Sequence, residues 1–397
     1  MKALLLTLLL AAPALADWPQ FRGPDGSGVS ADKNLPEKLD DSTQKWAADL
    51  PGRSVASPIA FGGHVYVVCT SGSRGDRLHV LAFDAKTGKK LWHRRLAATG
   101  STACHPKSSM AAMTPVADEK GVYALFATGD LAAFDHAGKL LWYRSLVGDY
   151  PTISNQLGLA SSPALFQGKL IVPMDNAGES FLAALDTGTG KNLWKTARPA
   201  DINWVTPVVR PLTSTDAEVL QLGPKGMTAY DATTGKKKWE HKSVSGGSTT
   251  PTLADGLLVV PSGGVSVFKP GEGKLEEVWA SPKYRTGYSS PLYFDGRVYA
   301  VAAGRVFSAD AKTGKDVWAY TLKGKQGTMY ASPVAGDGKV YVIGDTGAVT
   351  VLKAGGATDE ELSVSQLKAE CMGTPAISGG AVFVQTDKQL LCFAARK

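Results

Sequence analysis

Short apolar segments recur along the chain in a fixed order. A Ser/Thr-Pro pair opens each copy, a glycine-containing turn follows, and a stretch rich in β-branched and aromatic residues comes next, as in SPIAFGGHVYVV from Ser57. Short strands separated by glycine turns, without long amphipathic helical stretches, indicate an all-β chain. Eight copies stand 40 to 57 residues apart, and they begin at Ser57, Thr114, Ser162, Thr206, Thr250, Ser290, Ser332 and Thr374.

Each copy predicts two β-hairpins, which together make one four-stranded blade. In the copies with the full pattern a third strand follows, then a turn of the form Asp-x-x-Thr-Gly, then a fourth strand that ends in tryptophan, as in DAKTGKKLW from Asp84 to Trp92. The aspartate carboxylate and the glycine both suit a tight turn. A repeat of this length is typical of propeller blades, so we predict an eight-bladed β-propeller of four-stranded blades.

The two ends of the chain complement each other. The copy from Thr374 reaches Lys397 after its third strand, and Trp46 stands before the first copy without a blade of its own. We therefore expect an N-terminal strand around Trp46 to join the C-terminal blade and close the ring. The alternative is a seven-bladed ring in which the seventh copy, which lacks the closing tryptophan, does not form a blade. The tryptophans expected to dock neighbouring blades are Trp46, Trp92, Trp142, Trp194, Trp239, Trp279 and Trp318.

The turns that end in tryptophan resemble a known motif. Residues 84–92, 231–239 and 310–318 are similar to the tryptophan-docking motif of the pyrroloquinoline quinone (PQQ)-like propeller repeat family, and the resemblance runs from about residue 46 to 393. The segment WPQFRGPDG from Trp18 resembles the mature N-terminus of exported bacterial members. The resemblance implies a propeller distantly similar to the propeller subunit of the outer-membrane β-barrel assembly machinery.

The first residues have the layout of a secretory signal peptide. Lys2 precedes an apolar run, and a small-x-small end places the expected cleavage near Ala16. We expect a signal peptide at residues 1–16, an N-terminal extension at 17–42 and the propeller at 43–397. The mature protein is expected to be periplasmic or secreted, without a transmembrane segment.

The distribution of charge along the chain limits the classes of partner that we expect. The formal net charge is +7, but the lysines are scattered among turns, which favours a solvated basic surface over a nucleic-acid site.

The four cysteines of the sequence allow three different sets of disulfide pairings. Cys104 and Cys371 precede blades at one mouth of the channel and are a candidate disulfide, whereas Cys69 and Cys392 fall in strands near the expected closure. The sequence contains no C-x-x-C motif, so a zinc or redox site of that type is not predicted.

The resemblance to this family suggests an enzyme, in which PQQ would lie on the propeller axis beside a calcium ion and oxidise an alcohol or aldose. Resemblance to the quinoprotein alcohol dehydrogenases implies an adjacent cysteine pair that stacks on the quinone, and this sequence has none. It also lacks a recognisable acidic ligand-and-base set in its loops and a C-x-x-C-H haem motif. Among six dispersed histidines, His105 in a long inter-blade loop stands out, yet no nucleophile is paired with it. We therefore predict no catalytic residue, no cofactor and no metal ligand.

A ligand surface is predicted at the mouth of the channel. The residue two positions before each Ser/Thr-Pro pair should face this mouth, and four of the last five such residues are large: Trp204, Tyr288, Tyr330 and Met372. An amphipathic patch of this kind suits a peptide strand, a sugar ring or another protein. Polar residues expected nearby are Arg53, Asn155, Gln156, Asn203, Arg285, Gln326 and Glu370.

Together these features predict a non-catalytic, exported binding or scaffold propeller of the cell envelope. We expect a monomer whose partner is an envelope protein, a peptide or a glycan, and no nucleic-acid partner. One alternative is a PQQ-dependent, quinoprotein-like oxidoreductase. A weaker alternative is a carbohydrate-binding propeller that uses Trp204, Tyr288 and Tyr330.

Overall fold

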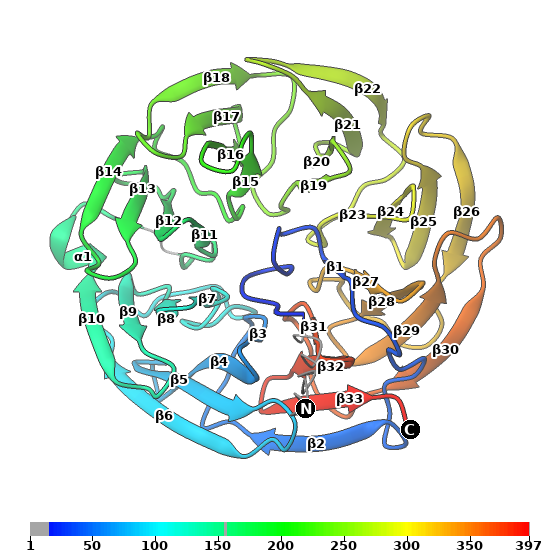
Figure 1. Ribbon diagram of the computed structural model, residues 1–397, viewed down its shortest axis with the longest axis horizontal. Helices are drawn as coiled ribbons and strands as arrows, with labels where there is room; N and C mark the ends of the chain where they lie inside the picture. The colour runs from blue at the N-terminus through cyan, green and yellow to red at the C-terminus, as the bar shows by residue number, and fades with distance from the viewer. Residues whose placement is uncertain (1–15, 155–156, 397) are drawn as a thin grey trace, which may run out of the picture.

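A computed structural model describes residues 16–154 and 157–396. Eight sheets stand around a common centre, each with its first strand innermost and its fourth strand on the circumference (Figure 1). The predicted all-β, eight-bladed propeller is confirmed, and the seven-bladed alternative is wrong. The expected signal peptide, apart from Ala16, and the polar candidates Asn155 and Gln156 lie outside the described residues.

Blades 1 to 4 are antiparallel meanders that follow one another along the chain. Blade 1 consists of β3 (Ile59–Phe61), β4 (His64–Ser71), β5 (Arg77–Asp84) and β6 (Lys90–Ala97). Blade 2 consists of β7 (Val116–Asp118), β8 (Gly121–Leu125), β9 (Asp130–Phe134) and β10 (Leu140–Ser145), followed by the short helix α1 (Leu146–Asp149). Blade 3 consists of β11 (Ala164–Phe166), β12 (Lys169–Met174), β13 (Phe181–Asp186) and β14 (Asn192–Ala197). Blade 4 consists of β15 (Val208–Pro211), β16 (Ala217–Gly223), β17 (Gly226–Asp231) and β18 (Lys237–His241).

Blades 5 to 8 continue the same order around the ring. Blade 5 consists of β19 (Thr252–Ala254), β20 (Leu257–Pro261), β21 (Val265–Pro270) and β22 (Leu275–Ser281). Blade 6 consists of β23 (Leu292–Phe294), β24 (Arg297–Ala302), β25 (Arg305–Asp310) and β26 (Asp316–Thr321). Blade 7 consists of β27 (Val334–Gly336), β28 (Lys339–Ile343), β29 (Ala348–Lys353) and β30 (Glu361–Gln366). Blade 8 takes β31 (Ala376–Ser378), β32 (Ala381–Gln385) and β33 (Gln389–Ala394) from the end of the chain.

The fourth strand of blade 8 comes from the N-terminal part of the chain, as predicted. Strand β2 (Gln44–Asp49) pairs antiparallel with β33, with Trp46 opposite Cys392. Figure 1 shows these two strands side by side, blue against red. This pairing covers the outer edge of β33, which would otherwise expose a row of unpaired N–H and C=O groups.

The tryptophans of the fourth strands lie between neighbouring blades. The Trp46 indole N–H donates to the Ala85 carbonyl at 3.2 Å, and its ring covers Gly88, where an added Cβ would lie 2.5 Å from the nearest ring atom. Because Gly88 also has a φ of +70°, the turn needs glycine for its backbone conformation and for the indole that packs on it. Five others donate to a carbonyl of the next blade: Trp92, Trp142, Trp194, Trp279 and Trp318. Trp239 instead donates to Glu218 Oε1 within its own blade.

A strap formed by residues 17–35 crosses the middle of the ring (Figure 1). Trp18 exchanges two backbone hydrogen bonds with Ala60 of blade 1, and Ala117 of blade 2 donates to the strap at 2.8 Å. Strand β1 (Val29–Ser30) of the strap pairs in parallel with β27 of blade 7. The strap therefore joins the inner edges of blades that are far apart in sequence.

Arg22 anchors the strap from within. Its side chain is fully buried, and its Nη2 donates to the carbonyls of Ser27 at 2.9 Å and Pro291 at 2.7 Å. Burial lowers the pKa of Arg22 to about 10, and the nearby Asp25 carboxylate opposes this shift. Since Pro291 directly precedes the first strand of blade 6, this contact fixes the neighbouring Phe21 relative to the axis.

The described part of the chain holds one short helix, α1, and no helix there is long and apolar enough to cross a membrane.

Candidate functional site

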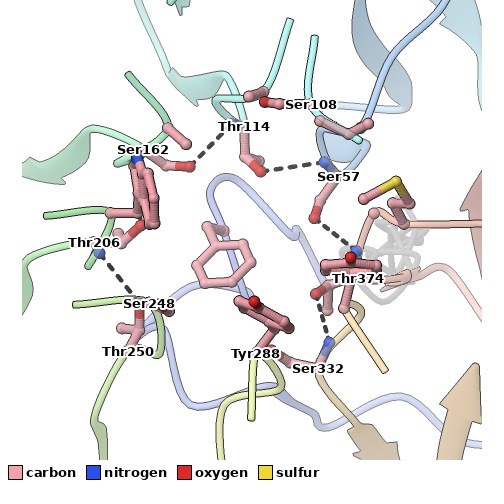
Figure 2. Close-up of a pocket in the computed structure, with 18 of the residues that line it drawn as sticks. Ser57, Ser108, Thr114, Ser162, Thr206, Ser248, Thr250, Tyr288, Ser332 and Thr374 are labelled. Carbon is pink, nitrogen blue, oxygen red and sulfur yellow. Dashed lines mark hydrogen bonds between the residues drawn. The ribbon is translucent and has the colours of Figure 1, made fainter. Parts of the chain in front are cut away.

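Eight hydroxyl groups form a closed circle around the propeller axis. The backbone N–H of Ser57 donates to Thr114 Oγ1 at 3.2 Å, and the N–H of Thr114 donates to Ser162 Oγ at 2.9 Å (Figure 2). The pattern continues through every blade. It ends where the N–H of Thr374 donates to Ser57 Oγ at 2.9 Å. These residues are the Ser or Thr of the eight Ser/Thr-Pro pairs, so each hydroxyl satisfies a buried N–H of the adjacent blade.

The positions two residues before these pairs surround a cavity of about 290 Å³. The eight residues at these positions all line it: Val55, Ala112, Ala160, Trp204, Ser248, Tyr288, Tyr330 and Met372. The loops that lead into the blades therefore do meet at one mouth. That these residues contact a ligand stays a prediction.

One side of the cavity is aromatic. Tyr288 and Tyr330 stack with ring centroids 5.1 Å apart and planes inclined by 26°, and Tyr288 is 52% exposed. In the view of Figure 2 the Tyr288 ring lies within the circle of hydroxyl residues. Trp204 is half-buried, and its indole N–H donates to the Gly158 carbonyl at 2.9 Å. Because this N–H already has a hydrogen-bond acceptor within the protein, an apolar group can pack on the indole face without leaving the N–H unpaired. The strap adds Phe21 to the lining.

A mouth loop, residues 101–109, reaches over the cavity from between blades 1 and 2. The Arg53 guanidinium donates to the carbonyls of Pro106 at 3.1 Å and Ser108 at 2.8 Å, so its fork is occupied by the loop backbone. The Lys107 ammonium lies 3.8 Å from the carboxylate of Asp345 in blade 7. Arg53 was expected at the ligand surface, but it positions the mouth loop and does not line the cavity.

The other predicted polar residues that the structure describes do not line the cavity either. Arg285 is exposed, Gln326 is buried with its Nε2 on the Lys323 carbonyl, and Asn203 is buried against Asp175. The described residues that line the cavity include neither these three residues nor Glu370. Sequence distance from the Ser/Thr-Pro pair does not show which way a loop side chain turns, and contact of these residues with a ligand stays a prediction. Polar groups reach the cavity instead from His105, Lys107, Ser108 and Ser248.

The candidate disulfide is not formed, since all four cysteines are free thiols. Cys371 is buried in the core shared by blades 7, 8 and 1, whereas Cys104 packs against the core of blades 1 to 3 beside Gly158. Cys69 and Cys392 do lie together in the core at the closure of the ring. Burial raises the thiol pKa to about 12 at the three buried positions, which keeps these thiols protonated and unreactive.

The cavity does not fit a calcium-bound quinone. Calcium takes six to eight oxygen ligands, with carboxylates prominent among them. Among the described residues that line the cavity none is Asp or Glu, and residues 16–154 and 157–396 contain no group of three or more His, Cys, Asp or Glu placed to hold a metal ion. His105 is exposed, and its Nδ1 accepts the backbone N–H of Lys107, as expected of a loop-capping residue.

A second polar cluster lies on blade 1, outside the cavity. Ser71 Oγ lies 2.8 Å from His79 Nε2, and His79 Nδ1 lies 2.9 Å from His93 Nε2. Burial, with smaller contributions from His93 and two nearby arginines, lowers the pKa of His79 to about 4. The pair is therefore neutral at pH 7 and serves as a partly buried hydrogen-bonded link between β5 and β6.

Fold and site together define a PQQ-like propeller with a carboxylate-free pocket at one mouth of its axis. The chain belongs to the family whose model is described as outer membrane protein assembly factor BamB, and that model matches residues 37–196 and 178–397.

Individual relatives of this chain carry different names. A polyvinylalcohol dehydrogenase of Sphingopyxis sp. is 29% identical over 239 residues, which are 49% of this chain and 34% of that protein. The outer membrane protein assembly factor BamB of Bordetella pertussis is 20% identical over 344 residues, which are 86% of this chain and 72% of that protein. The match thus spans about a third of the length of the polyvinylalcohol dehydrogenases.

Among solved structures, quinohemoprotein alcohol dehydrogenase from Comamonas testosteroni is similar with a TM-score of 0.69 and 14% identity, over 96% of this chain and 80% of that one. A likeness at this identity shows the propeller fold alone. Relatives with catalytic names and relatives named as assembly factors therefore share the fold, and the choice between them depends on the site.

Proposed function

We propose that this protein is an exported, non-catalytic propeller of the periplasm that binds a ligand or an envelope partner in the pocket at the mouth of its axis. The observation that carries the proposal is the composition of the pocket. Aromatic and small residues line it together with hydroxyls that already accept backbone N–H groups, and no lining residue described here is a carboxylate. This composition supports binding, and the lining lacks the carboxylates that a calcium site would use.

The quinoprotein oxidoreductase remains the second candidate because relatives named as dehydrogenases match half of this chain. Its family cofactor would sit on the axis, where Phe21 of the strap and the residues of the hydroxyl circle line the cavity. The residues found there lack the oxygen ligands that calcium requires.

Addition of PQQ and calcium to the purified protein separates the two candidates. We expect no stoichiometric change in quinone absorbance and no dye-linked dehydrogenase activity with alcohols. Stoichiometric quinone binding with turnover would overturn the proposal. Co-purification from the envelope fraction, with Tyr288→Ala as the matched surface variant, then tests whether a partner docks at the mouth.

A further inference from the structure

We infer that the mouth pocket accepts a planar aromatic group that is uncharged or negatively charged, held between the Tyr288–Tyr330 stack, Trp204 and the strap residue Phe21. This inference rests on the proposed function and names the chemistry of the ligand. The same aromatic group could belong to a free small molecule or to the side chain of an extended peptide.

Size is the first support. The cavity volume of about 290 Å³ lies just below the range for ligand sites, which run from roughly 300 to 1,000 Å³. The cavity can take one or two fused rings, and it is too small to enclose a folded surface. A partner would therefore insert a single group and leave the rest of its mass outside the mouth.

The flat walls are the second support. Tyr288 and Tyr330 already stack on each other, and Tyr288 keeps 52% of its surface exposed, so one ring face remains available beside the cavity. Phe21 meets the same cavity from the strap, on the chain segment that Arg22 holds in place. Aromatic rings gain from offset-stacked or edge-to-face contacts beyond the area they bury, so these walls favour a ring over an aliphatic chain.

Charge is the third support. Lys107 and His105 are the basic side chains in the described lining, and none of its residues is Asp or Glu. The counter-charge of Lys107 is Asp345, at 3.8 Å and outside the lining. A cationic ring would enter beside this ammonium group without a carboxylate to pair with, whereas an anionic ring would be attracted to it.

Fluorescence titration with 8-anilinonaphthalene-1-sulfonate, an aromatic anion, tests the inference on the mature protein. We expect saturable binding with one site per chain, and roughly tenfold weaker binding after Tyr288→Ala. Tyr288→Phe keeps the ring and should bind as the wild type does. Leu193→Ala is the matched control, because Leu193 on the outer strand β14 is 51% exposed and far from the mouth. Equal affinities for Tyr288→Ala and Leu193→Ala would overturn the assignment.

The strap contact needs its own variant. Phe21→Leu keeps most of the apolar volume and removes the flat face, so the strap should stay folded while binding of the probe weakens several-fold. Unchanged affinity for the probe would show that Phe21 does not contribute to the binding site. Circular dichroism and the melting temperature of Phe21→Leu check that the strap remains in place.

Competition with the bound probe tests charge and source. Naphthalene-2-sulfonate should displace the probe at least tenfold better than 2-naphthylmethylammonium, and Lys107→Gln should narrow this difference. Equal displacement by the two compounds would overturn the charge preference. A blocked Gly-Trp-Gly peptide that competes better than free indole would identify the side chain of a polypeptide as the source, and the reverse order would identify a small molecule.

Failure of this inference and failure of the proposed function can be distinguished. The probe assay contains neither quinone nor calcium, so turnover with PQQ would overturn the proposed function without affecting the probe result. Absence of a saturable site would overturn the aromatic pocket and leave the envelope co-purification as an independent test.

Discussion

The backbone N–H of Thr374 donates to the hydroxyl of Ser57 at 2.9 Å, and this bond joins the last blade to the first across 317 positions of the chain. Both groups are buried, so neither can exchange its partner for water. The bond completes a circle in which every Ser/Thr-Pro pair accepts from one neighbour and donates to the other. The ring is thus closed twice, by these hydroxyls near the axis and by β2 on the circumference.

Ser57→Ala should destabilise the protein by about 1–3 kcal/mol, because it leaves the buried N–H of Thr374 without an acceptor. Urea unfolding followed by tryptophan fluorescence measures the loss. Ser57→Thr is the control, since four blades already use threonine at this position and the hydroxyl is kept. Equal unfolding free energies for the two variants would contradict a role for the hydroxyl.

Trp46→Ala should lower the free energy of unfolding by about 3 kcal/mol, because it removes the indole that packs between the closing strand β2 and the turn between β5 and β6 of blade 1. Deletion of residues 17–50 should lower the melting temperature further, since it removes both β2 and the strap. Trp204→Ala, at the half-buried mouth, should lower it much less. A deletion variant that melts at the wild-type temperature would refute closure by the N-terminal strand.

Gly88→Ala should destabilise the first blade by more than 1 kcal/mol, because its φ of +70° disfavours an L-residue and its new Cβ would press on the Trp46 ring. Gly62→Ala shares a positive φ of +57° but meets no atom within 4 Å, so it reports the backbone cost alone. A double-mutant cycle between Gly88→Ala and Trp46→Ala should show a coupling energy, since the second change removes the steric clash. Additive effects would indicate that the indole does not press on this turn.

Stability should fall as the pH is lowered from about 6.5 to 4. Burial lowers the pKa of His79 to about 4 in the folded protein, and the pKa of His93 shifts in the same direction. The unfolded chain therefore binds more protons than the folded chain in this window, which favours unfolding by roughly 2 kcal/mol at its acidic end. Urea unfolding at pH 7, 5.5 and 4.5 measures the slope. His79→Gln should flatten it, and an unchanged slope would contradict this role of His79.

Arg53→Lys should loosen the mouth loop with little effect on global stability. Arg53 Nη1 donates to the carbonyls of Pro106 and Ser108 and Nη2 to the carbonyl of Lys107, and the single ammonium nitrogen of a lysine cannot reproduce this planar two-nitrogen arrangement. Hydrogen exchange of residues 105–108 should become faster, while the unfolding free energy changes by less than about 1 kcal/mol. Arg285→Lys, an exposed position off the cavity, should leave the exchange unchanged. Equal exchange in the two variants would show that Arg53 does not hold the loop.

The fold was predictable because its information is local and repeated. Ser/Thr-Pro, the glycine turn and the Asp-x-x-Thr-Gly turn each act within a few residues. The Ser/Thr-Pro pair recurs in all eight copies and the Asp-x-x-Thr-Gly turn in four. The unpaired Trp46 and the missing fourth strand after Thr374 then predict closure, and β2 confirms it. The same counting from each Ser/Thr-Pro pair led to the eight positions that line the cavity.

Tertiary structure alone decided which side chains complete the site. The sequence determined the blades, their number and their closure, because strand and turn preferences act between neighbours along the chain. It did not show that Phe21 would reach the cavity from the strap, that Arg53 would hold the mouth loop, or that Cys104 and Cys371 would pack in different cores. These outcomes depend on the direction of single side chains between segments that only the closed ring brings together, and no local pattern records that direction.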